Sequence, residues 1–305
     1  MPAERLLLLD TPSLYFRAFY GVPETVRAPD GTPVNAVRGL IDFIARLIRD
    51  HSPTRLVATM DADWRPAWRV AAIPSYKTHR IAPTGGETVP DPLVPQVAII
   101  TEVLDAVGLA TIGVEGYEAD DVIGTLATSA TVPVDVVTGD RDLFQLVRDA
   151  APAVRILYTA ARGVGRCDLV DEAFVSGKYG IPGRSYAEFA TLRGDPSDGL
   201  PGVPGIGEKS AAALVSRYGT VAAALSALDA GEEVPFAGKL TAARDYLAVA
   251  PTVVRVALDV PLPAYDDTLP LAPRDPARLV QLADRWGLDS ALNRLLAAMA
   301  ENQTA

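Results

Sequence analysis

The sequence predicts an α/β fold in which a mostly parallel central sheet is flanked by helices. Three short apolar runs have the length and composition of buried strands, and each leads to an aspartate, at Asp10, Asp61 and Asp140. Helical segments separate these runs, and strands that alternate with helices form parallel sheets. Ligands of such folds bind beyond the carboxyl ends of the strands, so we expect the three aspartates to meet there.

The predicted strands are residues 6–9, 56–60 and 134–137. The first two run directly into an aspartate, whereas the third reaches Asp140 through a Thr-Gly turn. Residues 37–48 are predicted to form a helix, because apolar side chains recur there at three- and four-residue spacing with charged side chains on the other face. This helix is expected to cover the sheet.

Between about residues 62 and 96 the alternation of strand and helix breaks down. The segment contains tryptophans and several basic side chains and ends in a Pro- and Gly-rich stretch from Pro83 to Pro95. It is too long for an ordinary connection, and it leaves from the acid at a strand end. We therefore expect a mobile, partly helical insertion over the carboxyl edge of the sheet.

From about residue 171 short, alanine-rich helices replace the strands. They are predicted at residues 210–218, 221–228, 240–248 and 277–300. The length of 305 residues is comfortable for two domains. We expect a core at residues 1–175 and a helical region at residues 176–305. A helix-hairpin-helix is expected at about residues 186–218, with the last helices packing on the core.

The composition excludes several classes of protein. With 49% hydrophobic and 22% charged residues, the chain is neither disordered, collagen-like nor a coiled coil. The single cysteine, Cys167, cannot form an internal disulfide, and no run approaches the roughly 20 apolar residues of a membrane span. The four leucines near the N-terminus are too few for a signal peptide. We expect a cytoplasmic protein without a membrane partner, and a monomer as the default state.

The net charge of −10, from 28 basic and 38 acidic residues, at first argues against a nucleic-acid partner. Nine of the acids, however, are candidate metal ligands. Without them the acidic and basic residues nearly balance, at 29 and 28. The bulk charge is therefore a poor guide if these acids are concentrated in one cation-binding site.

Three acidic motifs stand at predicted turns or helix starts, at residues 118–121, 138–142 and 194–198. Each has a plain alternative interpretation. The first suits a helix cap that complements the helix dipole, the second an Asx turn and the third an ordinary turn. Capping needs only one or two acids, so the surplus of like charge in the first motif indicates a bound cation.

A glycine-rich turn follows the third motif, where residues 200–210 read Leu-Pro-Gly-Val-Pro-Gly-Ile-Gly-Glu-Lys-Ser and open a helix. A Gly-x-Gly turn exposes backbone amides that can hold a phosphate, with Lys209 and Ser210 beside it. This is typical of a helix-hairpin-helix, which binds the nucleic-acid backbone without reading sequence. The alternative is a purely structural glycine hairpin.

In order and spacing these motifs resemble those of the 5′-nuclease family, which includes bacterial stand-alone flap endonucleases and the 5′-3′ exonuclease domain of DNA polymerase I. The resemblance runs from Asp10 to about Pro263, and no polymerase region follows, so the similarity is to a free-standing enzyme. It implies a hydrolase that cleaves phosphodiester bonds in 5′-flap, nicked or branched DNA and in RNA primers. The implied cellular role is lagging-strand maturation and DNA repair.

The resemblance implies metal ligands among the nine acids. The acids that match a first metal site are Asp10, Asp61, Glu118 and Asp120, and those that match a second are Asp121, Asp140, Asp142, Asp195 and Asp198. All-oxygen ligand sets suit Mg²⁺ or Mn²⁺ rather than zinc. We expect two or three such ions. Two ions about 4 Å apart can activate a water and hold both oxygens of the displacement. Asp120, Asp121 and Asp140 are the acids expected at the catalytic centre.

The resemblance also assigns residues that contact DNA. The insertion corresponds to a helical arch over a single-stranded 5′ end, and Lys77 and Arg80 match its basic pair, which helps hold the scissile phosphate. Tyr76 is expected to stack on an unpaired base, and Arg17 matches an arginine near the entrance. The hairpin contributes Gly205, Gly207, Lys209 and Ser210, where family members suggest a K⁺ ion. Arg65 and Arg69 either line the same passage or form a solvated helix face.

Two other functions stay open on the sequence. One is a DNA-junction binding protein of the same fold without catalysis, although nine concentrated acids would hinder pure binding. The other is a small-molecule phosphatase, which would need a second aspartate two residues after Asp10, where the sequence has Pro12. The phosphatase would also have no use for the glycine hairpin.

Overall fold

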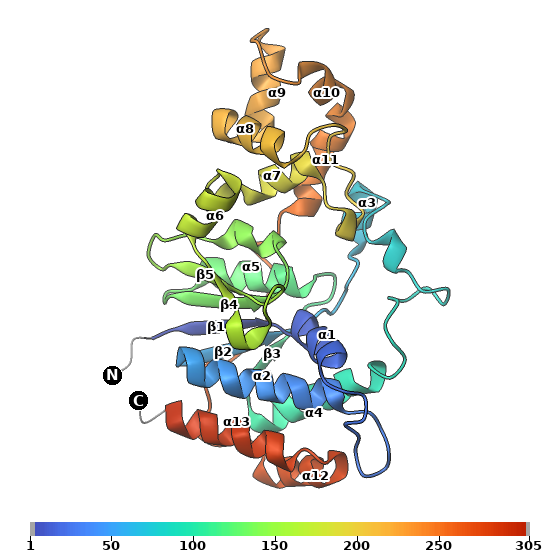
Figure 1. Ribbon diagram of the computed structural model, residues 1–305, viewed down its shortest axis with the longest axis vertical. Coiled ribbons are helices and arrows are strands. Elements are labelled where there is room, and N and C mark those ends of the chain that lie inside the picture. Colours follow the sequence, from blue (N-terminus) through green and yellow to red (C-terminus); the bar gives the residue numbers. More distant parts are fainter. Residues whose placement is uncertain (1–3, 303–305) are drawn as a thin grey trace.

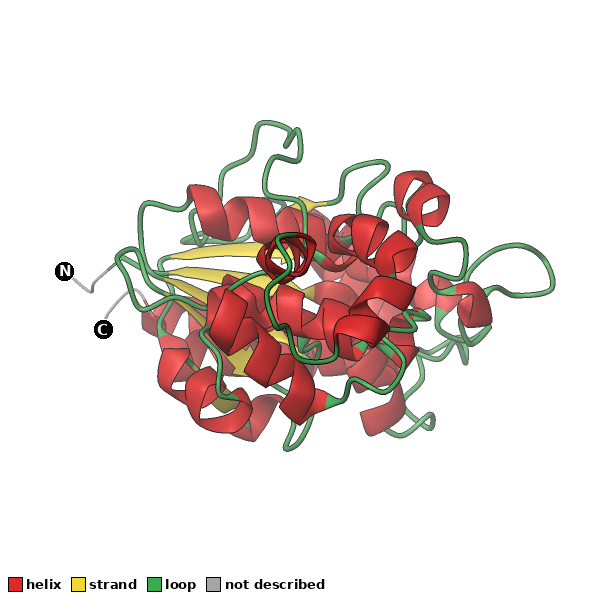
Figure 2. Cartoon of the chain, turned by 90° about the horizontal axis from the view of Figure 1, so that it is seen from above, coloured by secondary structure: helices red, strands yellow, loops and turns green. Residues whose placement is uncertain are grey.

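The structure, a computed structural model that describes residues 4–302, contains a six-stranded sheet with the order β3-β2-β1-β4-β5-β6. The strands are β1 (Leu6–Asp10), β2 (Arg55–Thr59), β3 (Ala110–Ile112), β4 (Val134–Thr138), β5 (Val154–Tyr158) and β6 (Asp168–Val170). The first five are parallel to their neighbours, and β6 pairs antiparallel with β5. The predicted mostly parallel sheet is confirmed, with helices on both of its faces (Figure 2).

Alternate side chains of the strands build two separate cores. Leu6 and Leu8 of β1 pack on one face of the sheet, whereas Leu7 and Leu9 pack on the other. One face is covered by α5 (Ala119–Ser129), α6 (Glu172–Tyr179) and α7 (Tyr186–Arg193). The other is covered by α1 (Thr11–Gly21), α2 (Asn35–His51), α4 (Val94–Val107), α12 (Pro276–Trp286) and α13 (Asp289–Asn302). The last two helices thus return to the sheet domain (Figure 1).

The insertion leaves the sheet after β2 and returns at α4. It contains α3 (Ala67–Ala72) and the 3₁₀ turn η1 (Thr78–Arg80), and residues 81–93 form no helix or strand. Arg65 ties its two parts together by donating from Nε to the Tyr76 carbonyl oxygen at 2.6 Å. In Figure 1 the insertion runs along the side of the molecule from which α1 also starts, away from the two chain ends.

The helical region forms the upper part of Figure 1. Its remaining helices are α8 (Glu208–Tyr218), α9 (Val221–Asp229), α10 (Ala237–Ala242) and α11 (Arg244–Val254). Further 3₁₀ turns are η2 (Asp142–Leu146), η3 (Val164–Arg166), η4 (Gly183–Ser185) and η5 (Pro196–Asp198). Among the described helices none alone is long and apolar enough to span a bilayer, although the sharply bent pair α8 and α9 would pass when taken together.

Two predicted helices are divided in the structure. The segment at residues 240–248 is split at Ala243 between α10 and α11. The segment at residues 277–300 is split because Gly287 adopts a φ of +64° and caps the end of α12. Its backbone amide donates to the carbonyl oxygen of Ala283.

Candidate active site

Five of the nine predicted acids line one pocket at the carboxyl edge of the sheet. The pocket has a volume of about 220 Å³, and the acids are Asp10, Asp61, Glu118, Asp120 and Asp140. They come from the ends of β1, β2 and β4 and from the start of α5. Parallel strands end at a common edge, and this topology brings together acids that are up to 130 residues apart.

Backbone and hydroxyl donors fix the orientation of the strand-end acids. Asp10 caps α1, with Oδ1 accepting from the Ser13 amide at 3.2 Å and Oδ2 accepting from the Thr138 hydroxyl at 2.6 Å. The same hydroxyl oxygen accepts from the Asp140 amide at 2.8 Å. Asp61 Oδ1 accepts from the Ala119 amide at 2.8 Å, at the first residue of α5. The pocket is therefore held by the local structure of β4 and α5.

Glu118 lies at the base of the insertion and is buried. It is the N-cap of α5 in a capping box, in which its side chain accepts from the Asp121 amide. Its Oε1 also accepts from the Tyr76 hydroxyl at 2.8 Å, and its Oε2 accepts from Lys77 Nζ at 2.5 Å. Arg69 Nη1 lies 3.2 Å from Oε1. Three residues of the insertion thus converge on one carboxylate.

Three other predicted acids of the second metal site, Asp142, Asp195 and Asp198, lie outside the 220 Å³ pocket but interact electrostatically with Asp140 or with one another. Asp195 caps η5 and accepts from the Ser197 amide at 2.9 Å, and its other oxygen lies 3.3 Å from Arg193 Nη2. Asp198 forms an ion pair with Arg80 at 3.0 Å. Asp142 Oδ1 is buried without a hydrogen-bond partner in the described part of the chain. A buried carboxylate oxygen without a hydrogen-bond partner is available as a ligand of a cation.

The structure gives Asp121 a different environment from the one expected of a metal ligand. Its side chain is fully buried and forms a double ion pair with Arg69, at 2.6 and 2.9 Å. Its oxygens also accept from the amides of Glu118 and Ala257. Asp121 is the third residue of α5, and its side chain points back to the Glu118 amide, whereas Asp120 lines the pocket. Asp121 therefore joins the insertion, α5 and the segment after α11.

The structure also corrects the expectation for two residues of the insertion. The Tyr76 ring is 2% exposed and its hydroxyl holds Glu118, so no face is left for an unpaired base. Arg69 was expected in the passage or on a solvated face, but it is 2% exposed and stacks on Trp68 at 4.4 Å. Both side chains are drawn inward because the buried carboxylates of Glu118 and Asp121 need donors.

The acids of the site repel one another. Burial, reinforced by Asp61 and Asp140, raises the pKa of Asp10 from 3.8 to about 7, against the lowering effect of Thr138 and Ser13. Burial and the Asp10 and Asp140 charges raise the pKa of Asp120 well above its usual range. Burial and three neighbouring aspartates do the same for Asp142. The site therefore holds more negative charge than its own side chains neutralise.

The donor set fits Mg²⁺ or Mn²⁺. All candidate ligands are carboxylate oxygens, which hard divalent cations prefer, and the unpartnered Asp142 oxygen and the raised pKa of the Asp120 carboxyl show unmet demand for positive charge. As they stand, no three His, Cys, Asp or Glu side chains of residues 4–302 close on one point in a way that would hold an ion. The acids surround a space instead, and several are engaged by Thr138, Lys77, Arg80 and backbone amides.

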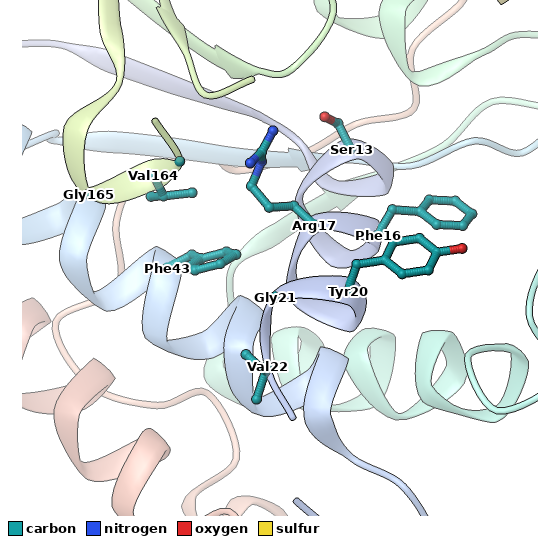
Figure 3. Close-up of a pocket in the computed structure, with 10 residues that line it drawn as sticks. Ser13, Phe16, Arg17, Tyr20, Gly21, Val22, Phe43, Val164 and Gly165 are labelled. Carbon is teal, nitrogen blue, oxygen red and sulfur yellow. The ribbon is translucent and has the colours of Figure 1, made fainter. Parts of the chain in front are cut away.

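Arg17 lines a second, larger cavity next to the acidic pocket. This cavity has a volume of about 760 Å³, and it shares Ser13 and Phe16 with the acidic pocket. Figure 3 shows Arg17 extending from α1 toward Val164 and Gly165, with Phe43 on α2 facing the same space. Arg17 Nε is buried and has no hydrogen-bond partner among the described residues. Arg17, which is predicted to contact DNA, thus has one N–H group without a hydrogen-bond partner among the described residues.

The glycine hairpin lies at the start of α8, in the helical region. Gly205 has a φ of +77°, which only glycine adopts easily, and Gly207 caps α8 without a side-chain hydrogen bond. Lys209 is exposed and Ser210 is half-buried, so the amides and both side chains are accessible at one helix start. Lys239 on α10 donates from Nζ to the Gly205 carbonyl oxygen at 2.8 Å. The hairpin therefore carries a second lysine from a distant segment.

Three residues of these sites, and the role of a fourth, Arg69, were not predicted from the sequence. Glu87, from the Pro- and Gly-rich stretch, lines the acidic pocket, and burial raises the pKa of its carboxyl. Thr138 bridges Asp10 and Asp140, Arg69 pairs with Asp121, and Lys239 lies on the hairpin. Thr138 was detectable from its place in the Thr-Gly-Asp turn. The other three depend on contacts between distant segments, for which the sequence carries no local signal.

Comparison with known proteins assigns the chain to a family. Residues 5–180 match the 5′-3′ exonuclease N-terminal resolvase-like domain, and residues 181–277 match the 5′-3′ exonuclease C-terminal SAM fold. A 5′-3′ exonuclease of Streptomyces coelicolor is 61% identical over 301 residues, which cover 96% of this chain and 99% of that protein. A 5′-3′ exonuclease of Mycobacterium tuberculosis is 50% identical over 310 residues, covering 96% and 97%.

Longer proteins and solved structures match as well. DNA polymerase I of Mycobacterium tuberculosis is 40% identical over 306 residues, which cover 97% of this chain and 32% of the polymerase. The T5 D15 protein, co-crystallised with metal ions, superposes with a TM-score of 0.64 at 15% identity, covering 98% of this chain and 99% of that one. At this identity the structural likeness concerns the fold. The family matches and the relatives together show that the chain belongs to the 5′-3′ exonuclease family and is a nuclease of the hydrolase class.

Proposed function

We propose that this nuclease uses divalent metal ions to hydrolyse phosphodiester bonds in 5′-flap, nicked or branched DNA and in RNA primers. The observation that carries the proposal is the acidic pocket itself, in which Lys77 and Arg80 lie beside five carboxylates. A pocket with this negative charge would repel a phosphate backbone unless cations mediate the contact. The two basic side chains then supply the direct contacts to the substrate.

In this proposal the first ion would be held by Asp10, Asp61, Glu118 and Asp120, and the second by Asp140, Asp142, Asp195 and Asp198. Asp121 is left out because its oxygens are committed to Arg69 and to two amides. When bound, the ions lower the pKa of a coordinated water and neutralise charge on the phosphate oxygens. The described backbone and hydroxyl donors hold the carboxylates in place before substrate arrives.

Lys77 and Arg80 would hold the scissile phosphate. Each now pairs with an acid, Lys77 with Glu118 and Arg80 with Asp198, and both line the pocket. Arg80 also donates to the Ser197 carbonyl oxygen at 2.8 Å, which links the insertion to the loop before the hairpin. A phosphate at the rim of the pocket is within reach of both side chains when they release these partners.

The duplex would be held away from the pocket by the hairpin, and the strand that enters the pocket would meet Arg17. The amides at Gly205 and Gly207, with Lys209, Ser210 and Lys239, form a phosphate-binding surface that reads no base sequence. Arg17 offers an unpartnered donor beside the pocket. The T5 D15 flap endonuclease has been solved with DNA and metal ions, and the catalytic core of Rad2 with DNA, which supports such a substrate class. We further propose removal of RNA primers and flaps as the cellular role, in keeping with the DNA polymerase I relatives.

The experiment that tests this function is cleavage of a labelled 5′-flap oligonucleotide, with single-strand and nicked substrates alongside. We expect cleavage in Mg²⁺ or Mn²⁺ and none in EDTA, and we expect Asp140→Asn to lose cleavage while it retains DNA binding. Asp50→Asn is the matched control, because Asp50 is an exposed acid on α2 that pairs with Arg46. DNA binding without cleavage by the wild type in either metal would identify a junction-binding protein instead.

A further inference from the structure

We propose that Tyr76 and Arg69 are positioning residues for Glu118, and that Lys77 is a displaceable counterion that competes with the metal ion for the same carboxylate. The inference rests on the proposed metal-dependent function and concerns how the insertion controls one ligand of the site. It assigns the insertion a role before any DNA is bound.

Several donors surround the Glu118 carboxylate. An ionised carboxylate has about four lone-pair sites. Oε1 faces the Tyr76 hydroxyl at 2.8 Å and Arg69 Nη1 at 3.2 Å, and Oε2 faces Lys77 Nζ at 2.5 Å. The capping box adds the Asp121 amide as a fourth donor. Both oxygens of Glu118 are thus engaged by side chains of the insertion, so a metal ion competes with these side chains for a Glu118 oxygen.

The donors around Glu118 differ in how firmly they are held in place. Arg69 is fixed by the double ion pair with Asp121, by a hydrogen bond from Nε to the Val253 carbonyl oxygen at 3.2 Å and by stacking on Trp68. Tyr76 is a buried ring in the core. Besides Glu118, Lys77 Nζ contacts the Trp64 carbonyl oxygen at 3.4 Å and lies 5.1 Å from the centre of the Tyr76 ring, and it lines the pocket. Lys77 is therefore the donor that a cation displaces.

The Lys77 side chain can move while its backbone stays in place. The Lys77 amide donates to the Asp198 carbonyl oxygen at 2.9 Å, and the residue adopts a φ of +48°. The neighbouring Ser75 hydroxyl donates to the Gly199 carbonyl oxygen at 3.0 Å. The insertion is thus anchored to the loop before the hairpin on either side of Tyr76. When metal displaces the ammonium group, Lys77 is released at the rim where a substrate phosphate would lie.

The test measures metal binding without DNA, by isothermal titration of Mn²⁺ into the full chain. We expect Lys77→Met to tighten binding at the first site on the order of tenfold, because it removes a competing cation from Glu118. We expect Tyr76→Phe to weaken binding by about tenfold, because loss of a ligand's hydrogen-bond partner usually costs that much metal affinity. Lys77→Arg keeps the charge and is expected to bind Mn²⁺ like the wild type.

The control is Lys178→Met, which removes an exposed lysine that stacks on Phe174, outside the acidic pocket. Circular dichroism of each metal-free variant reports folding separately from metal affinity. Failure of the wild type to bind Mn²⁺ would overturn the proposed function, and with it this inference. Mn²⁺ binding by the wild type with equal or weaker binding by Lys77→Met would overturn the inference alone. Equal shifts in the same direction for Lys77→Met and Tyr76→Phe would also contradict it.

Discussion

Asp120 and Asp121 are neighbours in the sequence, and isosteric amide substitutions are expected to have opposite effects on stability. Asp121 is fully buried and shares two hydrogen bonds with Arg69, so Asp121→Asn leaves a buried guanidinium with Glu118 as its remaining acid. Breaking a buried ion pair on one side costs about 3–5 kcal/mol. Because Glu118 still faces Arg69, we expect the lower end, about 3 kcal/mol.

Asp120→Asn removes a charge from a pocket in which burial and neighbouring acids raise the pKa of that carboxyl. At pH 8 and without metal, this change should stabilise the fold on the order of 1 kcal/mol. Urea denaturation in EDTA gives both values, and cleavage of a 5′-flap oligonucleotide in Mg²⁺ should be lost in Asp120→Asn. An Asp121→Asn protein as stable as the wild type, or an Asp120→Asn protein that is the less stable of the two, would refute the reasoning.

Three further predictions follow from the same contacts. The folded protein binds more protons than the unfolded chain between the ordinary Asp10 pKa of 3.8 and its folded value of about 7. The free energy of unfolding without metal should therefore fall as pH rises through this window, with Asp10 contributing about 4 kcal/mol in urea titrations. Mg²⁺ at about 100 times its Kd should raise the free energy of unfolding at pH 8 by about 2.7 kcal/mol. A Tm that does not change with Mg²⁺ would contradict the proposed metal site. Lys239→Ala should lower the salt slope of DNA binding by about 1, equally for unrelated sequences, whereas an unchanged slope in filter binding would exclude Lys239 from the interface.

A fifth prediction concerns the anchor of the insertion. Gly199 has a φ of +71°, and a Cβ atom there would lie 2.4 Å from the Ser75 carbonyl oxygen. Gly199→Ala should therefore detach the insertion from the loop before the hairpin and expose it to trypsin, which cleaves after its lysine and arginines. Gly177→Ala is the control, because a Cβ atom there meets nothing within 4 Å. Equal trypsin sensitivity of the two variants would contradict the contact.

The strands that sequence patterning finds are the central ones. β1, β2 and β4 are mostly apolar and, apart from Arg55, fully buried, and the structure places them within one residue of the prediction. β3 and β6 have three residues each and are partly exposed, so their composition carries little signal. β5 lies between β4 and β6, and its half-buried Arg155 and Tyr158 interrupt the apolar pattern.

The acidic pocket was predictable because it depends on topology. Acids at the ends of parallel strands meet wherever the strands are buried and adjacent, and Asp10, Asp61 and Asp140 satisfy this condition. The sequence predicts a metal ligand at Asp121 and a base-stacking ring at Tyr76. Their environments depend on Arg69 and Glu118, which lie 52 and 42 residues away. Sequence shows which acids stand at a helix start. It does not show which of these acids forms a buried ion pair.

The most direct test of the account is the position of bound metal. Crystals grown with Mn²⁺ and measured at the manganese absorption edge locate the ions by anomalous scattering, independently of any activity assay. The account predicts anomalous peaks between the Asp10, Asp120 and Asp140 carboxylates, with Lys77 turned away from Glu118 and with Asp121 still paired to Arg69. A pocket without anomalous signal in crystals of the active enzyme, or a peak coordinated by Asp121, would contradict it.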